Sequence, residues 1–118
     1  MKIGIFGLGY WGPNMVRNFL ANENVASVVC CDVNPKRLEP IKQRFPAVET
    51  VLDYKAILKN PSVVAVAIVT PVSTHFKLAK EALEAGKHVL VEKPMTESVK
   101  EIGWIMNYFF GILTAMLG

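Results

Sequence analysis

Three glycines near the amino terminus have the type and spacing of a phosphate-binding turn. Residues 7–12 give the pattern G-x-G-x-x-G directly after a short apolar run. In such turns the first glycine permits a tight bend, the second lets the backbone approach a pyrophosphate, and the third allows close helix packing. The amino terminus of the following helix would add unpaired N–H groups and a positive dipole. The candidate cofactor-binding residues of this turn are Gly7, Gly9, Tyr10, Trp11 and Gly12.

An acidic residue stands where such sites bind a ribose. Asp32 ends the next apolar run, about 20 residues after the last glycine of the turn. Its carboxylate would accept hydrogen bonds from the adenosine ribose hydroxyls and repel a 2′-phosphate, which favours NAD over NADP. Lys36 and Arg37 count against that preference, because either cation could hold such a phosphate. The residues therefore predict NAD as the cofactor, with NADP less favoured.

Alternating strand and helix patterns would place the turn and Asp32 at one edge of a sheet. Strands are predicted at 2–6, 25–31, 48–51, 63–69 and 88–91, and helices at 10–20, 34–45, 53–58 and 73–85. Asn34 and Pro35 are typical of a helix start, whereas Pro40 is expected to kink or split that helix. The run 63–69 is so apolar that we expect a central strand. This order predicts an α/β fold, a three-layer Rossmann-type parallel sheet with helices on both faces.

Composition argues against several other classes of protein. The 118 residues are 52% hydrophobic and 19% charged, which suits one packed core, and the net charge of +3 is too scattered for a nucleic-acid surface. Cys30 and Cys31 are neighbours in a predicted strand, so their side chains point to opposite faces and cannot hold a metal together. We expect buried, reduced thiols, no metal site and a cytoplasmic location. Glycines interrupt the first apolar run, so it does not resemble a signal peptide.

Three later segments carry a resemblance to a known family. They are Thr70–His75, with the sequence TPVSTH, Ala82–Leu90, with the sequence ALEAGKHVL, and Glu92–Met95, with the sequence EKPM. Together they resemble the glucose-fructose oxidoreductase / inositol dehydrogenase (Gfo/Idh/MocA) family, over residues 1 to about 101. The Glu-Lys-Pro after the last predicted strand is the most specific of these marks.

The resemblance implies roles for individual residues. Thr70, Pro71 and His75 are implied neighbours of the cofactor, as is Glu92, and Lys93 is the implied catalytic residue beside nicotinamide and substrate. A cation there could hold a substrate hydroxyl and stabilise a developing alkoxide. The residues alone leave His75 open as a surface residue at a helix start and Lys93 as a solvated lysine. The implied reaction is hydride transfer between nicotinamide and a sugar-like or polyol secondary alcohol.

The carboxyl-terminal stretch departs from the family pattern. Members continue into a second domain that holds the substrate, so we expect a truncated chain with the substrate domain missing. It should be inactive alone, because no His or Asp follows Lys93 for proton transfer. We divide the chain into a dinucleotide-binding domain at 1–101 and an apolar tail at 102–118, which has no charged residue. The tail is expected to be helical and to join copies into a homo-oligomer rather than span a membrane.

Two other functions fit part of the pattern. A non-catalytic nucleotide-binding or oligomerising remnant would use the same turn and the same acid. A methyltransferase also pairs a glycine-rich first turn with an acid after the second strand, but its glycine pattern is usually looser and Glu-Lys-Pro has no place in it. The sequence therefore favours the NAD-binding domain of an oxidoreductase.

Overall fold

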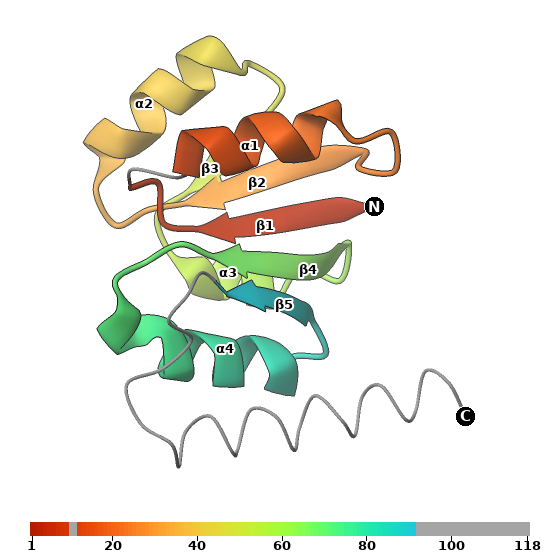
Figure 1. Ribbon diagram of the computed structural model, residues 1–118, viewed down its shortest axis with the longest axis vertical. Helices are drawn as coiled ribbons and strands as arrows, with labels where there is room; N and C mark the ends of the chain where they lie inside the picture. Colours follow the sequence, from red (N-terminus) through yellow and green to blue (C-terminus); the bar gives the residue numbers. More distant parts are fainter. Residues whose placement is uncertain (10–11, 92–118) are drawn as a thin grey trace.

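Five apolar runs of the sequence form the parallel strands of one sheet. The computed structural model describes residues 1–9 and 12–91. The strands are β1 (Lys2–Phe6), β2 (Ser27–Cys31), β3 (Glu49–Val51), β4 (Val63–Ile68) and β5 (His88–Val91). Their order is β3-β2-β1-β4-β5, and every neighbouring pair is parallel (Figure 1). The predicted central place of the fourth strand is confirmed, because β4 lies between β1 and β5.

The helices cover both faces of the sheet, which confirms the three-layer fold. They are α1 (Gly12–Ala21), α2 (Pro35–Arg44), α3 (Tyr54–Leu58) and α4 (His75–Glu84), and a 3₁₀ turn η1 (Val72–Thr74) precedes α4. In Figure 1, α1 and α2 lie on one side of the sheet and α4 lies on the other. Two apolar clusters fill the layers between sheet and helices. One joins Ile5 to Val16 of α1, and the other joins Phe6 to Ile57 of α3 and Leu78 of α4.

The two adjacent cysteines separate into these two clusters. Cys30 packs with Ile5 on the α1 side and Cys31 packs with Phe6 on the α4 side, as the alternation of a strand requires. Both are free and buried. Burial raises the pKa of Cys30 to about 12 and that of Cys31 to about 11, with smaller contributions from neighbouring charges. At neutral pH both thiols therefore stay protonated and unreactive.

Helix α2 begins as predicted but is not split by its internal proline. The Asn34 side chain accepts a hydrogen bond from the Lys36 N–H at 3.0 Å, and Pro35 occupies the first turn. The helix then runs from Pro35 to Arg44 with Pro40 inside it. Pro40 has no N–H to donate to the carbonyl of Lys36, four residues earlier. Both residues are exposed, so water can bind that carbonyl instead. Buried Leu38 and Ile41 hold the two halves to the sheet.

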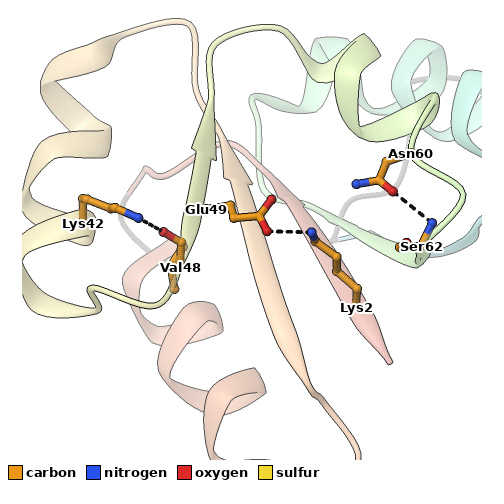
Figure 2. Close-up of polar contacts among 6 residues, drawn as sticks. All are labelled: Lys2, Lys42, Val48, Glu49, Asn60 and Ser62. Carbon is orange, nitrogen blue, oxygen red and sulfur yellow. Dashed lines mark hydrogen bonds and ion pairs between the residues drawn. The ribbon is translucent and has the colours of Figure 1, made fainter.

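Polar contacts fix the outer strands and loops. Lys2 Nζ of β1 pairs with Glu49 Oε1 of β3 at 2.8 Å, and thus spans β2 (Figure 2). Lys42 Nζ of α2 donates to the Val48 carbonyl at 2.6 Å. On the other side, the Ser62 N–H donates to Asn60 Oδ1 at 2.9 Å. Buried Lys87 donates to the carbonyl of the same Asn60 at 2.7 Å, which ties the start of β5 to the loop before β4.

The described residues include no helix that is long and apolar enough to cross a membrane. The predicted tail at 102–118 and the predicted start of the first helix at Tyr10 lie outside the described residues. The division of the chain at residue 101 therefore stays a prediction.

Candidate functional site

The strand order reverses at β1, and this creates a crevice at the carboxyl edge of the sheet. The chain leaves β1 toward β2 on one side, while β4 lies on the other side of β1. Open α/β sheets bind ligands at such a point. A pocket of about 550 Å³ opens there. Its lining comes from the ends of three strands, from α3, η1 and α4 on one face, and from Arg37 of α2, and includes Phe6, Gly7, Gly9, Asp32, Val33, Arg37, Tyr54, Thr70, Pro71, Thr74, Lys77 and Leu78.

Gly7 has a conformation that requires glycine. Its φ is +91°, in the region that L side chains rarely adopt. A Cβ at this position would lie 2.9 Å from Thr70 Cγ2 and 3.0 Å from the Thr70 backbone nitrogen. The Gly7 N–H donates to the Cys31 carbonyl at 2.8 Å. The first glycine of the turn therefore joins the carboxyl ends of β1, β2 and β4.

Gly9 and Gly12 are glycines for two other reasons. A Cβ on Gly9 would meet no atom of residues 1–9 and 12–91 within 4 Å, and the residue lines the pocket. This is the geometry that a phosphate-approaching glycine needs. A Cβ on Gly12 would lie 3.2 Å from the Gly7 carbonyl oxygen and 3.2 Å from Leu8 Cδ2. The third glycine thus lets α1 pack closely against the turn.

Asp32 is buried beneath the turn with its carboxylate fixed by backbone donors. It is 5% exposed. Its Oδ2 accepts from the Leu8 N–H at 2.9 Å and its Oδ1 accepts from the Asn34 N–H at 2.8 Å. Because a carboxylate has about four lone-pair sites, it can still accept ligand hydroxyls on the pocket side. The Arg37 guanidinium lies 3.7 Å from Oδ2, with its side chain 56% exposed.

A chain of hydrogen bonds shapes the loop after β4. Thr74 Oγ1 donates to the Pro71 carbonyl at 2.6 Å and therefore accepts from Thr70 Oγ1, also at 2.6 Å. His75 Nε2 lies 2.6 Å from the Thr70 carbonyl, which can only accept, so this nitrogen carries the proton. His75 is 2% exposed, so the alternative of a surface histidine is wrong. Among the described residues, the pocket lining includes Thr70 and Pro71 but not His75.

Three residues of the pocket wall were not predicted from the sequence, namely Tyr54, Lys77 and Leu78. Tyr54 starts α3 after the Asp53 cap, and its hydroxyl donates to Glu81 Oε2 of α4 at 2.5 Å. This hydrogen bond, with smaller effects of burial and nearby acids, raises the pKa of Tyr54 to about 12. Lys77 and Leu78 line the same wall from α4. Two features of the sequence could have indicated these residues. Lys77 and Leu78 follow Thr74 by about one helical turn, and Tyr54 follows the end of β3.

A second cavity of about 480 Å³ lies on the α1 side of the same edge. Asn14, Arg17 and Asn18 of α1 line it together with Leu90 of β5. Val69, at the end of β4, lines both cavities. The carboxyl edge therefore offers two adjoining hollows, one on each side of the sheet.

Four of the predicted site residues lie outside the described ranges, namely Tyr10, Trp11, Glu92 and Lys93. The structure thus brings together Gly7, Gly9, Asp32, Thr70 and Pro71 at one pocket. Within residues 1–9 and 12–91 there is no group of three or more His, Cys, Asp or Glu side chains that could hold a metal.

Solved structures share this fold. Scyllo-inositol dehydrogenase from Lactobacillus casei, with bound NAD(H) and scyllo-inositol, superposes with a TM-score of 0.84 at 28% identity, over 94% of this chain and 33% of that one. A 3-ketoreductase from Actinomadura kijaniata, in complex with NADP and TDP-benzene, gives a TM-score of 0.81 at 27% identity, over 92% of this chain and 33% of that one.

Sequence comparison points the same way. A 1-carboxy-3-chloro-3,4-dihydroxycyclohexa-1,5-diene dehydrogenase from Comamonas testosteroni is 42% identical over 101 residues, which are 86% of this chain and 25% of the relative. The chain thus spans about a quarter of that relative's length and a third of the two solved chains. The model of an oxidoreductase family with an NAD-binding Rossmann fold, Gfo/Idh/MocA, matches residues 1–108. The chain therefore belongs to the Gfo/Idh/MocA oxidoreductase family, as the Glu-Lys-Pro and Thr-Pro segments predict.

Proposed function

We propose that this chain binds NAD, in preference to NADP, across the carboxyl edge of its sheet. The pyrophosphate would lie over Gly9, the adenosine in the pocket beside Asp32, and the nicotinamide end toward the cavity beside α1. The observation that carries this proposal is Gly9, where a Cβ would meet no described atom within 4 Å although Gly7 and Gly12 are tightly packed. The two cavities that meet at Val69 support a long ligand, such as a dinucleotide, with one half in each cavity.

Within a longer oxidoreductase, this domain would serve hydride transfer to or from a sugar-like or polyol secondary alcohol. A bound nicotinamide dinucleotide supplies the hydride acceptor at C4 of its ring. The chain's share is to orient it: the turn would hold the phosphates, Asp32 the ribose, and Thr70 and Pro71 the loop against the cofactor. Lys93 would hold the substrate hydroxyl and stabilise negative charge on its oxygen.

Two further parts of the proposal concern the chain's setting. The buried, free thiols of Cys30 and Cys31 suit the reducing cytoplasm, which we propose as the location. The uncharged stretch 102–118 would need a partner surface, and we propose a second copy of the chain. Light scattering across a dilution series tests this, because a monomer at micromolar concentration would exclude the homo-oligomer.

Substitution of Gly9 tests the binding mode. Gly9→Val places a branched side chain where the pyrophosphate would lie, so calorimetric titration should detect no NAD binding. The fold should persist, because a Cβ at this position would meet no atom of the described residues within 4 Å. Ala26→Val is the matched control, since Ala26 is exposed just before β2, at the opposite edge of the sheet. Unchanged NAD affinity in Gly9→Val would exclude the phosphate turn as the binding site.

Cofactor choice tests the role of Asp32. Wild type should bind NAD more tightly than NADP, because the carboxylate repels a 2′-phosphate. Asp32→Asn should narrow this difference, since it removes the charge but keeps an acceptor for one backbone N–H. Arg37→Ala should widen this difference in affinity, because its guanidinium, 3.7 Å from Asp32, is placed to bind that phosphate. Titrations with both dinucleotides measure these ratios. A wild-type preference for NADP would contradict the assignment.

A further inference from the structure

Tyr54 joins the two helices that lie on the pocket side of the sheet. Its hydroxyl donates to Glu81 Oε2 at 2.5 Å, so α3 and α4 are tied together at this point. Its ring meets the Phe6 ring edge to face, with centroids 5.6 Å apart and planes at 62°. Both rings line the pocket beside Asp32. Tyr54 is therefore held in one orientation from two directions.

The same bond orients the wall that α4 contributes. Lys77 and Leu78 face the pocket, and Glu81 follows them by one helical turn. The part of the pocket near Tyr54 is apolar, with Phe6 and Leu78 beside it. An apolar-lined space next to an acid that would bind a ribose suits a purine ring better than a smaller pyrimidine, because the larger ring buries more apolar surface.

We propose that Tyr54, held by Glu81, is a positioning residue that sets the preference of this pocket for an adenine base. The inference rests on the proposed function, because it assigns the base end of the same dinucleotide site. The Tyr54 ring packs beside the base, and the bond to Glu81 keeps the ring from rotating into the space. Loss of that bond would leave the ring present but no longer fixed.

The test compares ADP with UDP, which share ribose and diphosphate and differ in the base. Calorimetric titration of the full chain is made at a temperature where every variant is folded. Wild type should favour ADP, and Tyr54→Phe should lower that preference about fivefold, the scale of one lost hydrogen bond. Glu81→Ala should do the same, whereas Glu81→Gln keeps an acceptor oxygen and should restore most of the preference.

Two further variants separate positioning from structural support. The double variant Tyr54→Phe/Glu81→Ala should lose no more preference than either single change, because both remove one bond. Glu84→Ala, an exposed position on the same helix, should leave the preference unchanged. Equal weakening of ADP and UDP in Tyr54→Phe, or a lower melting temperature with an unchanged preference, would overturn the role of Tyr54. Failure of wild type to bind ADP at all would instead overturn the proposed function itself.

Discussion

Gly7 and Gly9 are two residues apart, yet different forces require glycine at each. Gly7 has a positive φ and lies against the backbone at the end of β4, so it is the folded chain that requires glycine at this position. No described atom lies within 4 Å of a Cβ at Gly9, so in the binding mode that we propose it is the ligand that requires glycine there. A pattern of glycines in a sequence does not separate these two causes, whereas stability and binding measurements do.

Alanine substitutions at these two glycines should differ in their effect on stability. Gly7→Ala should lower the free energy of unfolding by about 1–3 kcal/mol, from backbone strain and contact with Thr70. Gly9→Ala should change it by less than about 0.5 kcal/mol. Urea denaturation followed by circular dichroism measures both values. Equal losses at the two positions would show that Gly9 is also required by the fold.

At the scale of elements, helix α2 shows how a local signal decides where a segment begins. Asn34 adopts an extended backbone, and its side chain accepts the Lys36 N–H, while Pro35 is already suited to the first turn. Lys42 then fastens the far half of the helix to the carbonyl of Val48. The helix is thus held at its start by its own cap and near its end by the residue just before β3.

Removal of the cap should weaken α2 without unfolding the domain. Asn34→Ala should lower the free energy of unfolding by about 1 kcal/mol, because the side-chain acceptor for the Lys36 N–H is lost. Asn34→Asp keeps an acceptor oxygen and should retain stability close to that of wild type. Thermal unfolding of the two variants gives the comparison. If Asn34→Asp loses as much as Asn34→Ala, the cap contributes nothing.

Most elements could be predicted because each has a strong local cause. The run 63–69 is apolar at every position and becomes β4, while Gly86, with a φ of +80°, follows the last turn of α4. Pro40 was predicted to kink or split its helix, and the helix is not split. Water can replace the lost hydrogen bond because Pro40 is exposed, and that exposure depends on how the helix packs. The start of β2 was placed two residues early, at Val25 instead of Ser27.

At the scale of the whole molecule, the site is predictable only in part. Gly9, Asp32 and Thr70 follow strand ends, and parallel strands bring their carboxyl ends to one edge, so their meeting could be foreseen. Tyr54 and Lys77 reach the same pocket because α3 and α4 pack on one face of the sheet. No local pattern encodes that approach, which depends on how the helices settle against Phe6 and its neighbours.

The chain by itself should show no dehydrogenase turnover. In the function that we propose, Lys93 alone would have to transfer the alcohol proton and enclose the substrate, which one side chain cannot do, whereas the proposed binding of the dinucleotide should remain. Purified protein is assayed for NADH formation with polyols, sugars and nucleotide-sugars, and Lys93→Ala controls for contaminating enzymes. NADH formation by wild type that disappears in Lys93→Ala would show that the chain is a complete catalyst.

The ion pair across β2 also bears on how the molecule avoids aggregation. The edge strand β3 has only three residues, and its first, Glu49, carries a charge on a side chain that is 58% exposed. A short, charged edge is a poor template for a strand from another chain, and Lys2 holds that charge in place. Exposed Leu52 follows directly after the strand. An apolar residue in place of Glu49 would remove the charge from β3 and add to the exposed apolar surface of Leu52. The edge strand would then be open to pairing with a strand of another molecule.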